Sequence, residues 1–166
     1  MSNYVIIVAG GKGLRMGGEI PKQFLPLAGK PVLMHTIERF YTYDRHLNII
    51  VVLPKEQQAH WKELCKEHHF AIPHQVVDGG DTRFQSSKNG LTAIPDGEEG
   101  LVAIHDGVRP FVTIAVIERC YDAAEESYAA IPVPPVTYTL RYIDSQKESK
   151  NVLRSDYRVV QTPQTF

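Results

Sequence analysis

Three short apolar runs constrain the fold of this chain more than any other feature. They read YVIIVA over residues 4–9, NIIVVL over residues 48–53 and LVAIH over residues 101–105. Because apolar residues occupy consecutive positions, each run predicts a strand that is covered on both faces, as in a parallel sheet. The helices predicted between and after them cover residues 31–43, 55–68, 83–93 and 114–127. This alternation predicts an open α/β sheet, which binds ligands beyond the carboxyl ends of its strands.

Composition and charge narrow the function classes. The chain has 166 residues, of which 43% are hydrophobic, and we expect one domain over residues 1–166. A formal net charge of -1 argues against sequence-independent nucleic-acid binding. The apolar runs are too short for a membrane span, and the chain does not open with a signal-peptide pattern. We therefore expect a cytoplasmic protein with neither a nucleic-acid nor a membrane partner.

A glycine-rich loop, GGKGLRMGG, follows the first apolar run. It fails the dinucleotide-binding fingerprint, because Met16 stands where the sixth position requires glycine. The later Gly29-Lys30 pair fails the P-loop pattern, because Pro31 replaces the hydroxyl residue that holds magnesium. What remains is a strand-end loop whose backbone N–H groups face an anion.

Three cations accompany this loop, and they indicate a polyphosphate ligand. Lys12 and Arg15 lie within the loop, and Lys22 follows it in a segment constrained by proline. The simpler interpretation of Lys12, a surface cation on a turn, has equal weight. For Arg15 and Lys22 together we favour a role at an anion site beyond a buried strand end.

Two further strand-end loops carry candidate ligand contacts. HDGVRP places Asp106 and Arg109 after the third apolar run, where Asp106 is a candidate ligand for a metal or a ribose hydroxyl. A turn aspartate and a structural ion pair are the simpler alternatives. VDGGDTR opens a predicted helix, so Gly80 and Ser86 are candidates for reading a base edge or holding an anion. A plain capped helix start is an equal alternative there.

The last part of the chain predicts a projecting hairpin. TYTLRYI and VLRSDYRVV are rich in strand-forming residues and flank a charged, turn-forming centre, DSQKESKN. We expect a β-arm over about residues 135–158, inserted in the single domain.

Five motifs in order resemble one enzyme family. AGGKGLRMG, PKQFLPLAGKPVLMHTIERF, GGDTRFQSSKNGL, HDGVRPF and TPQTF together resemble the cytidylyltransferases that transfer CMP from CTP to 2-C-methyl-D-erythritol 4-phosphate in isoprenoid precursor synthesis. The resemblance implies a Rossmann-like, three-layer α/β nucleotidyltransferase sheet, mostly parallel but mixed, with a β-arm exchanged between two subunits of a homodimer. It also leads us to expect that the C-terminal segment of the family is absent from this chain.

The resemblance assigns roles to individual residues. It implies two catalytic cations, Arg15 and Lys22, and places Thr139 and Arg154 on the arm as ligands of the sugar-alcohol phosphate. From its place in the HDGVRP loop we also expect Arg109 to contact the substrate. The implied nucleotide contacts are Val8, Ala9, Gly10, Gly11, Gly13, Gly80, Ser86 and Asp106. It further implies Mg²⁺ bound mainly through the CTP phosphates.

Two alternative functions stay open from the sequence. The first is a sister cytidylyltransferase that acts on ribitol 5-phosphate, whose glycine loop, PKQF and TPQ motifs are similar. The second is a nucleotide-binding module without catalysis. We favour methylerythritol phosphate because IPVPPVTYTLR resembles the arm of that group more closely.

Overall fold

A five-stranded sheet forms the centre of the molecule. A computed structural model describes residues 2–10 and 20–166 of the chain. The strands of the sheet are β1 (Tyr4–Val8), β4 (Asn48–Leu53), β5 (Gln75–Asp78), β6 (Val102–Asp106) and β9 (Gln164–Thr165). They follow the order β5-β4-β1-β6-β9, and all neighbours are parallel except β9, which runs antiparallel to β6. The mostly parallel, mixed sheet confirms the predicted fold class.

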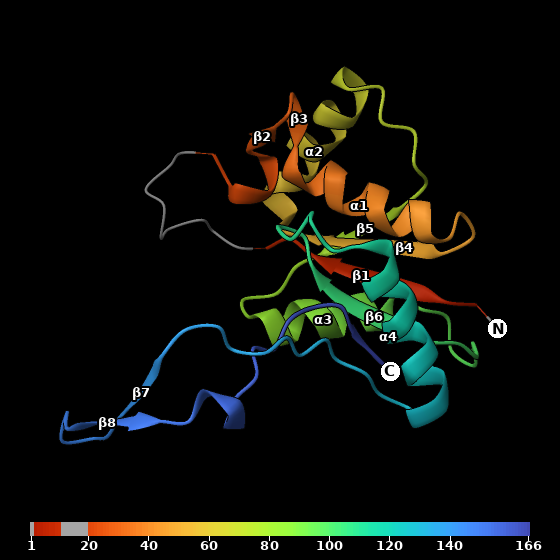
Figure 1. Ribbon diagram of the computed structural model, residues 1–166. Coiled ribbons are helices and arrows are strands. Elements are labelled where there is room, and N and C mark those ends of the chain that lie inside the picture. The colour runs from red at the N-terminus through yellow and green to blue at the C-terminus, as the bar shows by residue number, and fades with distance from the viewer. Residues whose placement is uncertain (1, 11–19) are drawn as a thin grey trace.

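Helices cover both faces of this sheet. They are α1 (Val32–Tyr43), α2 (Lys55–Glu67), α3 (Arg83–Thr92) and α4 (Ile114–Ser127). Figure 1 shows α1 and α2 on one side of the sheet and α3 on the other. Alternate residues of β1 face opposite sides of the sheet. Val5 and Ile7 pack with α1, whereas Ile6 belongs to the smaller cluster on the opposite face. Both faces are therefore buried, which is why the strand sequences are apolar at consecutive positions.

The predicted elements agree with the structure except at the edges. The four predicted helices are present within one residue at each end, and α4 has the predicted bounds. The edge strands β5 and β9 were missed, because β5 is only partly buried and β9 has two residues. A short antiparallel pair, β2 (Pro26–Leu27) with β3 (Lys30–Pro31), was also missed, as was the 3-10 turn η2 (Lys22–Phe24).

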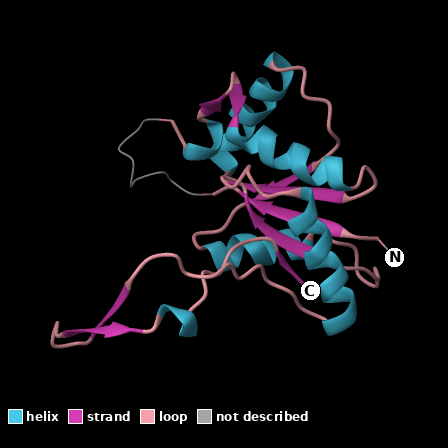
Figure 2. Ribbon diagram, viewed as in Figure 1, coloured by secondary structure: helices cyan, strands magenta, loops and turns pink. Residues whose placement is uncertain are grey.

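The arm is a hairpin that extends away from the sheet (Figures 1 and 2). It consists of β7 (Leu140–Ile143), β8 (Ser149–Val152) and the 3-10 turn η3 (Arg154–Asp156). The predicted turn over residues 144–151 is too long, because β8 begins inside it. The Asp144 carboxylate accepts hydrogen bonds from the backbone N–H groups of Gln146 and Glu148, and these bonds close a shorter turn.

Two further features of the described residues concern the cysteines and the helices. Cys65 and Cys120 are both free thiols, and they lie on separate helices, α2 and α4. Within residues 2–10 and 20–166, the structure contains no helix of the length and apolarity needed to cross a bilayer.

Gly90 allows α3 to lie directly on the sheet, and its replacement tests this packing. A Cβ atom at Gly90 would lie 2.5 Å from Cγ2 of Ile6 and 3.2 Å from Cγ2 of Val52, both on buried strands. We expect Gly90→Ala to lower the free energy of unfolding by about 1 to 3 kcal/mol, despite the better helix propensity of alanine. Denaturant unfolding measures this change. Lys88→Ala, an exposed substitution on the same helix, is the control and is expected to change it by less than about 0.5 kcal/mol; equal stabilities for the two variants would contradict the packing argument.

Candidate nucleotide site

The carboxyl ends of β1 and β6 lie side by side and form the first part of the site. Val8 pairs with Asp106 across the parallel ladder, and the N–H of Gly107 donates to the carbonyl of Val8 at 2.8 Å. On the other side of β1, the N–H of Ala9 donates to the carbonyl of Val52 at 2.9 Å. The structure therefore brings Val8 and Ala9 next to Asp106, as an open α/β sheet requires of a ligand edge.

The turn that begins α3 forms the second part. Thr82 caps the helix by accepting a hydrogen bond from the N–H of Gln85 at 3.1 Å, and the N–H of Gly80 donates to Ser86 Oγ at 3.0 Å. A Cβ atom at Gly80 would lie 2.4 Å from Cβ of Gln85, so only glycine fits this turn. The Ser86 hydroxyl oxygen lies 3.8 Å from the position of a Cβ atom on Gly10. The predicted contacts Gly10, Gly80 and Ser86 are thus gathered in one place.

The Asp106 carboxylate lies between two guanidinium groups. Arg83 Nε donates to one carboxylate oxygen at 3.2 Å, and Arg109 Nε donates to the other at 2.9 Å. Burial by itself would raise the pKa of Asp106, but the hydrogen bond from Arg109 and the charge and hydrogen bond of Arg83 outweigh it and hold the pKa below its usual value. Asp106 is therefore ionised, and the three groups together carry one net positive charge.

This arrangement does not suit Asp106 as a metal ligand. Both carboxylate oxygens already accept hydrogen bonds from arginine. Among the residues that the structure describes, there is no cluster of three or more histidine, cysteine, aspartate or glutamate side chains able to hold a metal ion.

The chain that returns from the arm also contacts these arginines. Arg109 Nη1 donates to Oε1 of Gln161, and the guanidinium of Arg83 lies 3.5 Å from Oε1 of Gln164. The hydroxyl of Thr162 accepts from the N–H of Asp106 at 3.3 Å. No role was predicted for Arg83, Gln161 or Gln164, because contacts between segments so far apart in the chain leave no spacing pattern.

His105 fixes the backbone of the loop that carries Asp106 and Arg109. Its ring is fully buried and packs edge-on against Phe40 at 4.9 Å between ring centres. Nε2–H donates to the carbonyl of Arg109 at 3.1 Å, so Nδ1 carries no proton, and Nδ1 has no partner among the described residues. Burial lowers the pKa of His105 to about 4, so the ring is neutral at physiological pH.

Lys22 is presented by a turn that is anchored through its neighbours. Gln23 is buried and its Nε2 donates to Oε1 of Gln57 on α2 at 2.7 Å. Phe24 stacks on Trp61 with 6.1 Å between ring centres. The buried pair leaves the preceding residue, Lys22, at the surface of η2. The other predicted residues of the glycine loop, Gly11, Lys12, Gly13 and Arg15, lie outside the described residues.

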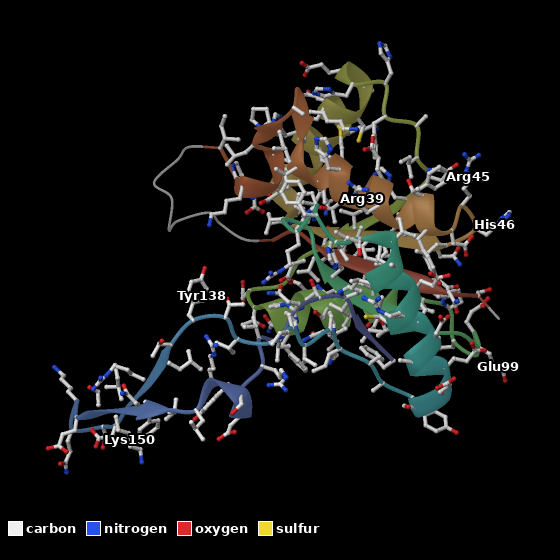
Figure 3. All side chains as sticks on the ribbon, viewed as in Figure 1. Arg39, Arg45, His46, Glu99, Tyr138 and Lys150 are labelled. Atoms are coloured by element: carbon white, nitrogen blue, oxygen red, sulfur yellow. The ribbon has the colours of Figure 1, made fainter. Side chains whose placement is uncertain are left out.

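The arm residues lie apart from this edge within one chain. Arg154 Nη1 donates to the carbonyl of Thr137 at 3.1 Å, so Arg154 is held near the start of the arm and close in sequence to Thr139. Figure 3 shows Tyr138 on the near part of the arm and Lys150 at its far end, well away from the sheet. The structure therefore does not bring Thr139 and Arg154 together with Asp106 in a single subunit.

An apolar groove of about 990 Å³ adjoins the site. Arg109 and Gln161 line it at the side of the site, and the remaining wall comes largely from the loop of residues 108–113, from α4 and from residues 130–134. Phe111 also lines the groove and is 77% exposed. Such exposed apolar surface next to a polar site is typical of an interaction surface rather than of a phosphate pocket.

Comparison with known proteins agrees with this geometry. The sequence model of the 2-C-methyl-D-erythritol 4-phosphate cytidylyltransferase family matches residues 3–166. Two curated relatives of that name, from Bacteroides thetaiotaomicron and Phocaeicola vulgatus, are 60% and 58% identical over the whole of this chain, which covers 74% of each relative.

Solved structures of similar enzymes share the fold. The 4-diphosphocytidyl-2C-methyl-D-erythritol synthase of Anaerococcus prevotii superposes with a TM-score of 0.82 at 28% identity, over 99% of this chain and 69% of that one. The 2-C-methyl-D-erythritol 4-phosphate cytidylyltransferase of Thermus thermophilus superposes with a TM-score of 0.73 at 32% identity, over 100% of this chain and 70% of that one.

The neutral, buried His105 predicts a specific acid sensitivity. Its imidazole takes up a proton at its ordinary pKa in the unfolded chain but only at about pH 4 in the folded protein. The unfolded state therefore binds more protons between these values, so stability falls as the pH falls through this window. We expect the wild type to lose about 3 kcal/mol more unfolding free energy than His105→Gln, which keeps an N–H donor, between about pH 7 and about pH 4.

Denaturant unfolding across this pH range measures the difference. His46→Gln, at an exposed position in the loop after α1, is the control and is expected to follow the wild type. Parallel pH profiles for His105→Gln and the wild type would show that His105 is not held neutral.

Proposed function

Because the chain belongs to the 2-C-methyl-D-erythritol 4-phosphate cytidylyltransferase family, we propose that it transfers CMP from CTP to 2-C-methyl-D-erythritol 4-phosphate and releases pyrophosphate. The observation that carries this proposal is the 60% identity to a curated relative of that name over the full chain. The same observation favours methylerythritol phosphate over ribitol 5-phosphate as the acceptor. The reaction places the chain in isoprenoid precursor synthesis.

The proposed chemistry needs charge stabilisation more than covalent help. A phosphate oxygen of the acceptor bonds to the α-phosphorus of CTP while the bond between that phosphorus and the bridging oxygen to the β-phosphate breaks, so pyrophosphate leaves with the electron pair. Negative charge grows on the non-bridging and leaving oxygens. In our proposal Lys22 and Arg15 stabilise that charge, and Gly80, Ser86 and Asp106 hold the cytidine at the sheet edge.

We propose that Mg²⁺ accompanies the nucleotide rather than occupying a site made by the protein. This follows from the Asp106 carboxylate, whose two oxygens are engaged by Arg83 and Arg109. When bound, the ion neutralises part of the triphosphate charge.

A cytoplasmic location likewise stays a prediction, in keeping with the free thiols of Cys65 and Cys120.

We further propose that the arm completes the site of a second subunit. Large apolar side chains are exposed along and beside the arm, among them Tyr138, Ile143 and Leu153. An isolated two-stranded hairpin is at best marginally stable in water, so it needs a surface to pack against. A homodimer would cover these side chains, and it would bring Thr139 and Arg154 to the partner's Asp106 edge, which they do not reach in their own subunit.

Pyrophosphate release tests the reaction and the acceptor together. The purified chain is given CTP, Mg²⁺ and either 2-C-methyl-D-erythritol 4-phosphate or ribitol 5-phosphate. We expect turnover with the first acceptor and at least tenfold lower kcat/KM with the second. The opposite preference would move the chain to the sister enzyme class, and saturable CTP binding without turnover on either acceptor would favour a non-catalytic module.

Removal of Lys22 tests its proposed catalytic role. We expect Lys22→Ala to lower kcat roughly 10²- to 10³-fold, since it deletes one preorganised cation facing the transferred phosphoryl group. The fold should be unaffected, because the buried neighbours Gln23 and Phe24 hold the turn. Lys66→Ala, on an exposed turn at the far end of α2, is the control with the same chemical change. Wild-type turnover in Lys22→Ala would refute this role.

Subunit mixing tests whether the arm acts in trans. Lys22→Ala and Arg154→Ala are each expected to be inactive as homodimers. When the two are unfolded and refolded together, half of the dimers are mixed, and one of their two sites combines an intact Lys22 with an intact partner arm. We therefore expect roughly a quarter of wild-type activity in the mixture.

Light scattering on the same samples supplies the control for this experiment. Dimers without recovered activity would show that each arm serves its own subunit. A strictly monomeric wild type would remove the dimer from the proposal altogether.

A further inference from the structure

Arg83 connects the two loops that form the candidate site. It is the first residue of α3, and it follows the turn that holds Gly80 and precedes Ser86 by three positions. Its guanidinium crosses to β6 and donates to the Asp106 carboxylate at 3.2 Å. The resemblance to the family gave this side chain no role, and neither the composition nor the spacing of the sequence pointed to it.

The contact between Arg83 and Asp106 differs in kind from the contact between Arg109 and Asp106. Arg109 is three residues from Asp106 on the same loop, so their ion pair cannot fix that loop relative to the rest of the site. Among the described residues, Arg83 makes the only hydrogen bond to the Asp106 carboxylate from a different element. Arg83 is therefore the side chain that ties the Asp106 carboxylate to the turn at the start of α3.

The helix that carries Arg83 is itself rigidly placed. Gly90 lies against Ile6 and Val52 of the central strands, and Asn89 Nδ2 donates to the carbonyl of Asp78 at 2.8 Å. The hydroxyl oxygens of Thr82 and Ser86 accept hydrogen bonds from backbone N–H groups of the turn at the start of the helix. The backbone of Arg83 is therefore held in place, so its hydrogen bond restrains the Asp106 carboxylate.

We propose that Arg83 is a positioning residue for nucleotide binding, which acts by holding the Asp106 carboxylate at a fixed distance from the Gly80 and Ser86 turn. This inference rests on the proposed function, because Asp106, Gly80 and Ser86 are taken as cytidine contacts. Arg83 acts on CTP through Asp106, so its loss affects the binding of CTP and leaves the acceptor and the transfer step almost unchanged.

The primary test is the affinity for CTP, measured by calorimetry without an acceptor, alongside steady-state kinetics. We expect Arg83→Met to raise the Kd for CTP roughly tenfold, the low end for a charge-assisted hydrogen bond, because its side chain is 47% exposed. The KM for the acceptor should stay within about twofold and kcat within about threefold of the wild type. Arg83→Lys, which keeps the charge and a single donor, should recover part of the affinity.

A matched control separates the contact from general electrostatics. Lys88→Met removes one positive charge from the exposed side of the same helix without a contact to Asp106. We expect it to bind CTP like the wild type. An equal loss of affinity in Lys88→Met and Arg83→Met would overturn the proposal, because net charge alone would then explain the effect.

A double-substitution cycle separates positioning from direct contact with the nucleotide. If Arg83 acts through Asp106, then adding Arg83→Met to Asp106→Ala should change the Kd for CTP by less than about twofold. A further tenfold loss in that background would overturn the proposal and make Arg83 a nucleotide ligand in its own right. Wild-type affinity in Arg83→Met alone would overturn it too.

The binding measurement also keeps this inference apart from the proposed reaction. A wild-type chain that binds CTP but transfers nothing would refute the proposed function, and the Arg83 test would still be decided by Kd. A wild-type chain that turns over normally, together with an Arg83→Met variant of unchanged CTP affinity, would refute only the inference.

Discussion

The burial of the central residues of β1 is the constraint on which the rest of the structure depends. Val5, Ile6 and Ile7 are all fully buried, so neither face of this strand can lie against water. Helices must then cover both faces, and parallel neighbours must flank both edges, as β4 and β6 do. Parallel strands end together, so this hydrophobic requirement alone places Val8, Val52 and Asp106 at one edge, where polar loops can gather around a ligand.

The electrostatics of this edge follow from how unequally its ionisable groups are buried. His105 and Asp106 are adjacent in sequence, but the alternation of β6 sends His105 into the core beside Phe40 and leaves Asp106 beside two guanidinium groups. Burial keeps the histidine neutral, whereas the arginines keep the aspartate ionised. One side chain can then serve as a fixed hydrogen-bond donor to the backbone of Arg109, and the other as a fixed charge.

The sequence predicted the parts of this molecule that local patterns determine. The strands β1 and β4 and the helix α4 were located closely, because a run or period of apolar residues is visible within a single segment. The glycine turns around Gly80 were also recognised. The two-residue strand β9 was missed, because its pairing with Ala103 and Ile104 depends on a partner about sixty residues away.

The candidate site was predicted only in part, for the same physical reason. Gly10 lies beside Ser86, and Val8 lies beside Asp106, because the topology of the sheet brings these strand ends together. The tie from Arg83 to Asp106 joins two elements with no shared spacing, so it could be found only in three dimensions. The catalytic and binding roles of all the predicted site residues stay predictions, as does the division into a single domain with an arm over about residues 135–158.

The arm is connected directly to the candidate site, because the chain that leaves the arm runs into that site. After η3 the N–H groups of Val159 and Gln161 donate to the carbonyls of the residues that lead into the arm, Pro134 and Pro132. Gln161 and Gln164 then contact the guanidinium groups of Arg109 and Arg83. An arm that docks on a second subunit therefore ends, within its own subunit, at the residues that orient the Asp106 carboxylate. The position of the arm and the arrangement of the residues at the Asp106 edge then depend on one continuous segment. This connection is a physical reason for the domain to carry so exposed a hairpin.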